Sequence, residues 1–341
     1  MKDLIVQKYG GSSVGDIEKI QNVAKRIIKT KKSGKNVVVV VSAMGNTTDE
    51  LIKMAYSISD RPIERELDAL LSTGEQISIS LLAIAIENMG HEVISLTGAQ
   101  CGIITSNKHF KARINEINTQ RLESELSQGK IVIVAGFQGI NKENDITTLG
   151  RGGSDTTAVA LAAALKAELC QIFTDVEGVY TADPRIVPDA KLISEISYDE
   201  ILELASLGVK VLHPRAVELA GNHKVPIEVR SSFTENKGTL IKEEVKMEKV
   251  LIRGISLDEN IGKISVLEVP DKPGIAFKLF SSLAEADIHV DMIVQNVNRS
   301  SVNDITFTVA LEELQEALEV AQKFAFEVDA QKVIYDRGVA K

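Results

Sequence analysis

The run of five valines at residues 37–41 constrains the fold more than any other stretch of this chain. Valine is β-branched and favours extended backbone. A continuous apolar strand of this kind is typical of a parallel sheet that is buried on both faces. Residues 4–9 and 131–134 form similar short apolar runs, and helix-like patterns lie between the three runs. The sequence therefore predicts strands that alternate with helices.

Apolar residues recur at helical spacing between these strands. The pattern predicts helices over residues 16–31, 48–57, 72–89, 113–128, 156–167 and 198–207, and a last one that ends at 222. It predicts further strands over residues 92–96, 170–174 and 227–230. Such an alternation indicates an α/β fold of three layers around a mostly parallel sheet.

A smaller unit follows a charged segment without periodicity at residues 242–249, where we place the domain boundary. The expected order beyond it is strand 263–269, helix 275–286, strand 291–296, strand 304–309, helix 312–324 and strand 332–335. This βαββαβ order is that of a ferredoxin-like sandwich. The expected domains are residues 1–245 and 249–341, and a strand-like piece at 250–256 is left over.

The composition argues against several classes of protein. A formal net charge of −9 over 341 residues disfavours nucleic acid or an anionic membrane as the main partner. No stretch approaches the roughly 20 apolar residues of a membrane span, and the N-terminus lacks a signal-peptide core. Cys101 and Cys170 are isolated and the 5 histidines are scattered. We therefore expect reduced thiols, a cytoplasmic protein and no protein-held metal site.

Glycine-rich and polar clusters follow the strands of the first unit, and ligands bind at the carboxyl ends of parallel strands. The sequence KYGGSS at residues 8–13 places a lysine at a strand end and a glycine turn before a helix, as in a phosphate-binding turn. It matches neither the Walker A pattern nor the dinucleotide-binding GxGxxG. An ordinary strand–helix turn with a surface lysine explains it equally well.

The sequence GRGGSD at residues 150–155 forms a second such turn. Its glycines allow a ligand to approach the backbone, and Arg151 offers a planar fork to a carboxylate or phosphate. Ser154 or Asp155 is expected to cap the following helix. An ordinary capped loop is the alternative. Two such turns in one sheet, one with Lys8 and one with Arg151, favour phosphoryl transfer.

Transfer to a carboxylate needs no general base, because a carboxyl group with a pKa of about 4 is ionised at neutral pH. The obstacle is repulsion between two anions, which Lys8, Mg²⁺ and backbone amides would reduce. Asp155 would orient Lys8 or the Mg²⁺ shell, unless it is only a helix cap.

An amino-acid acceptor needs a cation for its carboxylate and an anion for its ammonium group. Arg151 suits the first and Glu75 the second. Ser42 and Thr48 are available as hydroxyl contacts, although both are also common turn residues.

A series of motifs in order resembles the aspartokinases of the amino-acid kinase superfamily. They are KYGGSSVG, VVSAMGNTTDEL, STGEQIS, VAGFQG, LGRGGSDTTA, TDVEGVYTADPR and GVKVLHPRA, and they extend from residue 1 to about residue 240. The resemblance implies that ATP and L-aspartate give 4-phospho-L-aspartate and ADP, at the entry to lysine, threonine and methionine synthesis.

The resemblance also implies roles for single residues. The ATP phosphates would be held by Lys8, Tyr9, Gly10, Gly11 and Ser12. Aspartate would be held by Ser42, Thr48, Glu75, Arg151, Gly152, Gly153 and Ser154, while Lys8 and Asp155 would act at the reacting centre. The nucleotide would be lined by Thr174, Asp175, Tyr180, Asp183, Arg185 and Lys210. Mg²⁺ would arrive with the ATP.

The smaller unit resembles an ACT domain, a module that pairs with another and binds amino acids. The positions that match its effector-binding pattern are Asp271, Gly274, Ile275, Ala276, Gln295, Asn296 and Thr306. Lysine or threonine, or both, would be the effector. Family members usually carry a second ACT unit beyond the point where this sequence stops, so feedback inhibition stays open. The piece at 250–256 would then lack neighbours, and an unpaired strand favours a homo-oligomer.

Two other interpretations are open from the residues. The chain could be another kinase of the superfamily, acting on acetylglutamate, glutamate, carbamate or UMP, or a catalytically silent amino-acid sensor. The pair Glu75 and Arg151 favours a free amino acid over carbamate or UMP. Intact Lys8, Arg151 and Asp155 count against a silent sensor.

Overall fold

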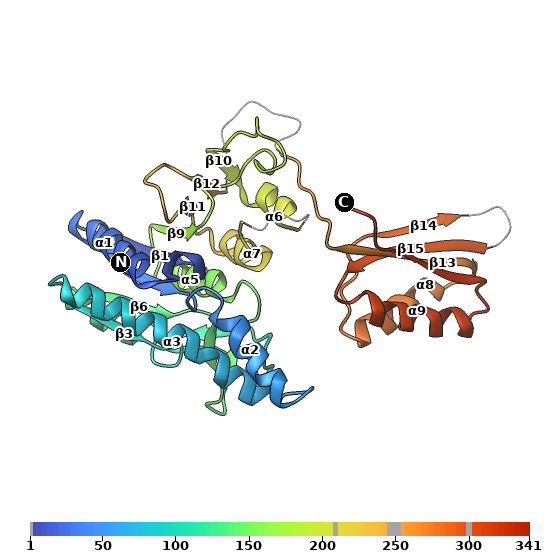
Figure 1. The fold of residues 1–341 in the computed structure, drawn as a ribbon, viewed down its shortest axis with the longest axis horizontal. Coiled ribbons are helices and arrows are strands. Elements are labelled where there is room, and N and C mark those ends of the chain that lie inside the picture. The colour runs from blue at the N-terminus through green and yellow to red at the C-terminus, as the bar shows by residue number, and fades with distance from the viewer. Residues whose placement is uncertain (1–2, 207–210, 244–253, 298–301) are drawn as a thin grey trace. The chain divides into compact units, whose positions relative to one another are not determined.

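The computed structural model describes residues 3–206, 211–243, 254–297 and 302–341. The chain divides into two compact units, Met1–Ile255 and Ser256–Lys341 (Figure 1). The division lies C-terminal to the boundary expected at residues 242–249. Most of the strand-like piece predicted at 250–256 falls outside the described residues.

The first unit is built on an eight-stranded sheet with the order β10-β12-β11-β9-β1-β2-β6-β3. Its strands are β1 (Leu4–Tyr9), β2 (Asn36–Val41), β3 (Val93–Leu96), β6 (Ile131–Ala135), β9 (Leu169–Thr174), β10 (Glu195–Ser197), β11 (Ile227–Ser231) and β12 (Thr239–Lys242). Neighbouring strands pair in parallel, except that β11 and β12 are antiparallel. The predicted, mostly parallel sheet is confirmed.

The valines of β2 show why the unit has three layers. Val38 and Val40 enter one hydrophobic core, whereas Val37, Val39 and Val41 enter another on the opposite face. The first core is covered by α4 (Gln120–Ser127), α5 (Gly153–Ala164), α6 (Tyr198–Ser206) and α7 (Pro214–His223). The second is covered by α1 (Ile17–Lys32) and α3 (Glu64–Asn88), with the short η1 (Gly11–Val14) at its end. Helix α2 (Thr47–Ile58) packs on α3.

A second, small sheet was not predicted. It has the order β5-β4-β7-β8 and consists of β4 (Ile103–Thr105), β5 (Ile114–Ile117), β7 (Gln138–Ile140) and β8 (Ile146–Thr148). The helix predicted over residues 113–128 is therefore wrong in its first part, because residues 114–117 pair with β4. Ile114 and Ile117 are three residues apart and both pack on the core, a spacing that a helix would also give.

Helix α3 corrects two further expectations. It begins at Glu64, earlier than the predicted residue 72. It is also long and apolar enough to cross a membrane by length and composition, contrary to the statement that no stretch approaches such a span. Helices in the core of a folded protein can be equally long and apolar, and α3 packs against α1, α2 and the strands β3 and β6. The apolar residues that α3 buries therefore pack against other elements of the same unit.

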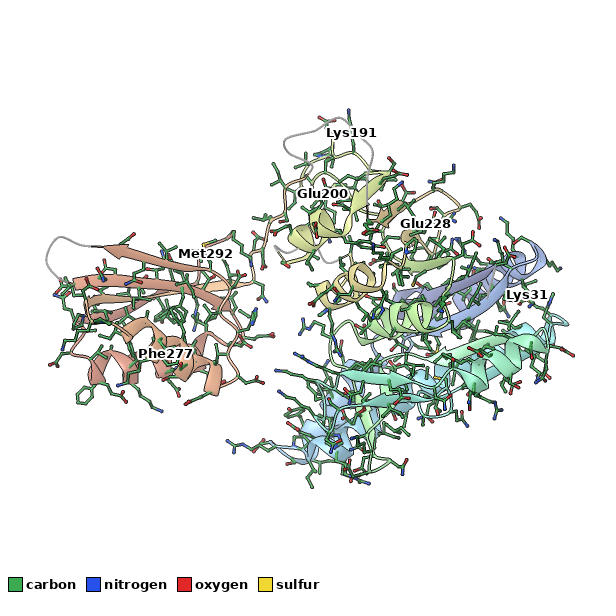
Figure 2. The ribbon with its side chains drawn as sticks, turned by 180° about the vertical axis from the view of Figure 1, so that it is seen from behind. Lys31, Lys191, Glu200, Glu228, Phe277 and Met292 are labelled. Carbon is green, nitrogen blue, oxygen red and sulfur yellow. The ribbon has the colours of Figure 1, made fainter. Side chains whose placement is uncertain are left out.

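The second unit has the predicted βαββαβ order. It consists of β13 (Ile261–Pro270), α8 (Ile275–Glu285), β14 (Ile293–Val297), β15 (Val302–Ala310), α9 (Leu314–Glu327) and β16 (Lys332–Asp336). The antiparallel sheet has the order β14-β15-β13-β16. Its core forms between sheet and helices around Phe307. Phe277, on α8, instead points outward and is 78% exposed (Figure 2).

Candidate active site

The two glycine turns meet at the carboxyl end of the central strand. Lys8 is the penultimate residue of β1, and Asp155 lies in the first turn of α5, which packs on β1. The Lys8 Nζ lies 2.7 Å from the Asp155 Oδ1, and the two side chains are only 11% and 13% exposed. Because water is largely excluded, this ion pair is stronger than one at the surface.

A cavity of about 250 Å³ opens beside this pair. Its lining consists of Lys8, Ser42, Thr48, Glu75, Phe137, Gly150, Arg151, Gly152, Gly153, Ser154 and Asp155. The structure thus brings together all the residues that the sequence assigned to the acceptor and the reacting centre. Phe137 was missed, although it lies in the VAGFQG motif at the end of a strand.

Glu75 is the buried acid of the cavity and comes from the middle of α3. Its Oε1 accepts a hydrogen bond from the Ala43 N at 3.1 Å, whereas its Oε2 has no hydrogen-bond partner among the described residues. Burial raises the pKa of Glu75 to about 7. Buried polar atoms rarely stay unpaired, so the free oxygen marks a place for a donor such as an ammonium group.

The start of α5 differs from the prediction. The N-cap is Gly152, with a φ of +70°, and neither Ser154 nor Asp155 takes that position. A Cβ on Gly152 would lie 2.3 Å from the Cγ of His213, so only glycine fits. Ser154 and Asp155 therefore fall within the first turn and line the cavity.

Helix α7 holds the loop that carries Arg151. The Arg215 guanidinium donates to the Leu149 O at 2.9 Å and to the Ala112 O at 2.8 Å. His213 caps α7 by accepting from the Arg215 N at 3.3 Å, and burial lowers the pKa of His213. The motif GVKVLHPRA contained both residues, but nothing in their spacing indicated these contacts.

Helix α3 holds the other side of the same loop through Asp68. This fully buried carboxylate accepts from the Phe110 N at 3.1 Å, from the His109 Nδ1 at 2.8 Å and from the Thr148 Oγ1. Thr148 ends β8, two residues before Gly150. The Arg151 loop is therefore fixed from two helices.

Apart from Lys8, none of the described residues predicted for the nucleotide lines this cavity. The Gly10 N donates to the Phe173 O at 3.2 Å, so the first glycine turn lies beside the segment that begins at Thr174. Within that segment the Thr174 Oγ1 donates to Asp175 at 3.1 Å, and the Tyr180 OH donates to Glu177 at 3.3 Å.

Three other residues predicted for the nucleotide, Tyr9, Asp183 and Arg185, have side chains in contact with other residues of the protein. Asp183 and Arg185 form an ion pair with each other at 2.6 Å. The Tyr9 side chain is fully buried and stacks on Phe173 with 4.7 Å between ring centroids, so only its backbone can face a ligand. Lys210 lies outside the described residues.

The predicted effector residues gather in two places of the second unit. Gly274, with a φ of +86°, caps α8, and Ile275 and Ala276 follow it. In the same turn, Asp271 accepts from the Asn303 Nδ2 at 3.0 Å.

The remaining effector residues lie on the sheet. Gln295 and Asn296 lie on β14, and the side chains of both are exposed. Thr306 is hydrogen-bonded to Ser265 at 2.8 Å. The side chains of Gln295 and Thr306 point to opposite faces of the sheet, since the strand register pairs Gln295 with Ile305.

Comparison with known proteins defines the class. The profile of the Amino acid kinase family matches residues 3–231, and an ACT domain profile matches residues 265–323. The chain belongs to the amino acid kinase family.

Within that family its relatives are aspartokinases. It is 52% identical to an aspartokinase of Geobacillus stearothermophilus over 99% of this chain and 82% of that protein. It is 50% identical to an aspartate kinase of Stutzerimonas stutzeri, over the same shares of the two chains. The resemblance read from the motifs is confirmed.

Solved structures of aspartate kinases have a similar fold. E. coli aspartokinase III, crystallised with aspartate and ADP, has a TM-score of 0.82 at 26% identity, over 99% of this chain and 86% of that one. Aspartate kinase from Synechocystis has a TM-score of 0.66 at 47% identity, over 99% of this chain and 59% of that one.

Glu75→Gln should stabilise the protein at high pH. The native pKa of Glu75, about 7, exceeds the ordinary value of 4.5, so its contribution to stability is complete below pH 4.5 and lost as the pH rises through 7. Glutamine avoids the buried charge and keeps the acceptor for the Ala43 N. We expect a gain on the order of 2 kcal/mol in the free energy of unfolding at pH 8 and almost none at pH 4. Urea titrations at both pH values measure it, and a gain independent of pH would refute the assignment.

Arg215→Gln should loosen the Arg151 loop. Loss of two hydrogen bonds of about 1 kcal/mol each should raise amide exchange of residues 149–153 by about tenfold. Hydrogen exchange with mass spectrometry measures this. Arg121→Gln is the matched control and should leave the loop unchanged, because it removes an exposed guanidinium of α4 whose partner Glu125 keeps its ion pair with Lys130. Equal exchange in the two variants would remove Arg215 from this role.

Proposed function

We propose that the cavity transfers the γ-phosphoryl group of ATP to the side-chain carboxylate of L-aspartate, giving 4-phospho-L-aspartate and ADP. One observation carries the proposal. A buried carboxylate oxygen of Glu75, with no hydrogen-bond partner in the described parts of the chain, belongs to a residue that lines the same cavity as Arg151 and the Lys8–Asp155 pair. The similarity to relatives also supports the proposal, because these relatives are aspartate kinases.

The cavity suits a free amino acid. Its volume of about 250 Å³ is below the roughly 300–1,000 Å³ of pockets for drug-sized ligands. The Arg151 guanidinium binds the α-carboxylate as a planar fork, and the Glu75 Oε2 accepts from the ammonium group. Acetylglutamate has an uncharged amide in place of that ammonium group and would leave the Glu75 carboxylate without a cation, which disfavours this alternative. Ser42, Thr48 and Ser154 supply hydroxyl groups.

The reacting carboxylate of aspartate then lies toward Lys8. One of its oxygens attacks the γ-phosphorus, a new oxygen–phosphorus bond forms, and the bond to the ADP oxygen breaks. No proton moves, because the acceptor is already ionised at neutral pH. Lys8 lowers the repulsion between the two anions, and Asp155 holds the Lys8 ammonium in place at 2.7 Å.

Mg²⁺ fits the site as an ion carried by the nucleotide. Among the described residues there is no group of three His, Cys, Asp or Glu side chains that could hold a metal by itself. The buried carboxylate of Asp155, next to Lys8, is the protein group that would contact the ion. When bound, Mg²⁺ supplies further positive charge to the phosphate oxygens.

The nucleotide is proposed to lie across the first glycine turn and the segment after β9. Gly10, Gly11 and Ser12 offer backbone donors to the phosphates. Thr174, Asp175, Tyr180, Asp183, Arg185 and Lys210 line the base and ribose. The hydrogen bond that joins Gly10 to Phe173 supports this arrangement, because it sets the two segments side by side.

The second unit is proposed to regulate the first in response to an amino acid. E. coli aspartokinase III was crystallised with lysine as well as aspartate, with a TM-score of 0.78 to this chain. Lysine or threonine would bind at the α8 turn and β14. We also propose a homo-oligomer, a cytoplasmic location and a place at the entry to lysine, threonine and methionine synthesis.

Hydroxylamine trapping tests the function. With ATP and aspartate the full chain should form aspartyl hydroxamate. Glutamate and N-acetylglutamate serve as competing acceptors in parallel reactions. A hydroxamate from glutamate and none from aspartate would overturn the proposal, and none from any acceptor would indicate a sensor.

Lys8→Ala should lower kcat by about a hundredfold or more while the KM for aspartate changes little, since the charge of Lys8 acts mainly as the phosphoryl group transfers. Steady-state kinetics at saturating ATP measure both. The control is Lys35→Ala, which removes an ammonium that bridges Asp3 and Glu168 at the surface. An unchanged kcat in Lys8→Ala contradicts the role.

Arg151→Lys should raise the KM for aspartate by about tenfold with a smaller change in kcat. A point charge cannot make the two parallel hydrogen bonds of a guanidinium. Saturation curves with aspartate at fixed ATP measure the effect. Identical curves for the variant and the unsubstituted protein would show that Arg151 does not bind the carboxylate.

A further inference from the structure

A second cavity of the first unit has no part in the proposed reaction. It has a volume of about 330 Å³ and lies between α1 and the loop after β11. Its lining consists of Ser13, Lys19, Asn22, Val23, Lys25, Arg26, Lys29, Ser232, Phe233 and Glu235. Among the described residues, none lines both this cavity and that of Lys8.

The lining is strongly cationic in a chain of net charge −9. Lys19, Lys25, Arg26 and Lys29 face one carboxylate, that of Glu235. Lys25 is exposed and has no ion-pair partner in the described part of the chain, whereas Lys19 pairs with Asp16 outside the lining at 3.1 Å. The helical spacing of α1 puts these cations on one face, so their potentials add at the cavity.

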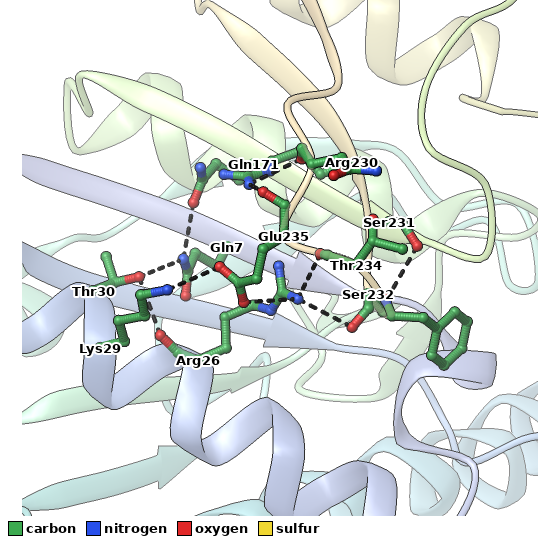
Figure 3. Close-up of polar contacts among 12 residues, drawn as sticks. Gln7, Arg26, Lys29, Thr30, Gln171, Arg230, Ser231, Ser232, Thr234 and Glu235 are labelled. Atoms are coloured by element: carbon green, nitrogen blue, oxygen red, sulfur yellow. Dashed lines mark hydrogen bonds and ion pairs between the residues drawn. The ribbon is translucent and has the colours of Figure 1, made fainter.

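The wall opposite α1 is held in shape by Arg26 (Figure 3). The Arg26 Nη2 donates to the Thr234 O at 2.8 Å and to the Ser232 O at 3.3 Å, and the guanidinium lies 5.0 Å from the Phe173 ring centroid. Arg230 donates from the other side, to the Glu235 O at 3.0 Å. Two guanidinium groups therefore organise the loop before any ligand arrives.

Glu235 shows where an anionic group would lie. Its carboxylate contacts both the Lys29 Nζ at 2.9 Å and the Arg26 Nη2 at 3.3 Å (Figure 3). The side chain is 64% exposed, so it can leave this position without unpacking the core. The pKa of Glu235 is lowered, first by the hydrogen bond from Lys29. Glu235 thus places a carboxylate of the protein itself at the cationic site.

We propose that this cavity binds a small molecule with two or more negative charges, carried by phosphate or carboxylate groups, which displaces Glu235 from Arg26 and Lys29. The volume is that of a small-molecule pocket rather than of a macromolecular interface. The Ser13 and Ser232 hydroxyl groups, which are hydrogen-bonded to each other, supply polar contacts at the wall.

Calorimetric titration of the full chain with inorganic pyrophosphate tests the proposal. Saturating ADP and aspartate fill the other anion sites, because the Ser232 Oγ also donates to the Thr174 O at 3.1 Å and the two regions are close. We expect one pyrophosphate per chain, with an affinity that falls as salt is added.

Three variants locate the binding. Lys25→Gln with Lys29→Gln should weaken pyrophosphate about tenfold, since each exposed cation contributes up to about 1 kcal/mol. Glu235→Gln should strengthen it several-fold, because the competing carboxylate is gone. Lys32→Gln, at the exposed end of the same helix and outside the lining, is the matched control and should not change it. Unchanged hydroxamate formation shows that each variant is folded.

The opposite results overturn the inference. They are no binding at millimolar pyrophosphate, equal weakening by Lys32→Gln, or a Glu235→Gln variant that binds no more tightly than the unsubstituted protein. The first would mean that the cavity is a surface cleft without a ligand. The second would mean that the helix attracts anions only through its general charge, and the third that the anion does not displace Glu235.

Discussion

The contact between Lys8 and Asp155 is the constraint on which the active site depends. It requires that β1 lie in the middle of the sheet and pair in parallel with β2 and β9, so that the turns after these two strands flank its carboxyl end. It also requires that α5 start directly above that end. Gly152 makes this start possible, because any side chain there would collide with His213. The position of the Lys8 ammonium group beside Asp155 therefore depends on the strand register of the sheet and on Gly152.

Helix α3 combines structural support and a cavity-lining residue on a single face. Asp68, Ser72 and Glu75 follow one another at helical spacing. Asp68 holds Phe110 and the end of β8. The Ser72 O accepts from the Gln138 Nε2 at 2.9 Å, and Glu75 lines the cavity. The helix therefore builds the wall and supplies the acid. The burial of Glu75, on which its proposed contact with an ammonium group depends, also makes its charge costly, a conflict between stability and function that active sites often contain.

The Lys8 cavity and the cavity beside α1 each have an arginine next to a loop that hydrogen bonds hold in place, but the loops are held differently. Arg151 lies on a loop clamped by Arg215 and Asp68, whereas Arg26 lies on a helix and itself clamps a loop. In each case carbonyl oxygens accept from a guanidinium group, so the loop beside the cavity is held in place before a ligand binds. Preorganisation of this kind lowers the entropy lost on binding.

The sequence by itself determined the alternation of the longer strands with helices, the βαββαβ unit and all the residues of the Lys8 cavity except Phe137. It could do so because periodicity is local, and because clusters after parallel strands must meet at one edge of the sheet. Only the tertiary structure decided the small sheet of β4, β5, β7 and β8, the cap at Gly152, the buried side chain of Tyr9 and the clamp by Arg215. Strands of three or four residues carry too little periodicity to be recognised. Contacts between distant segments leave no local pattern in the chain.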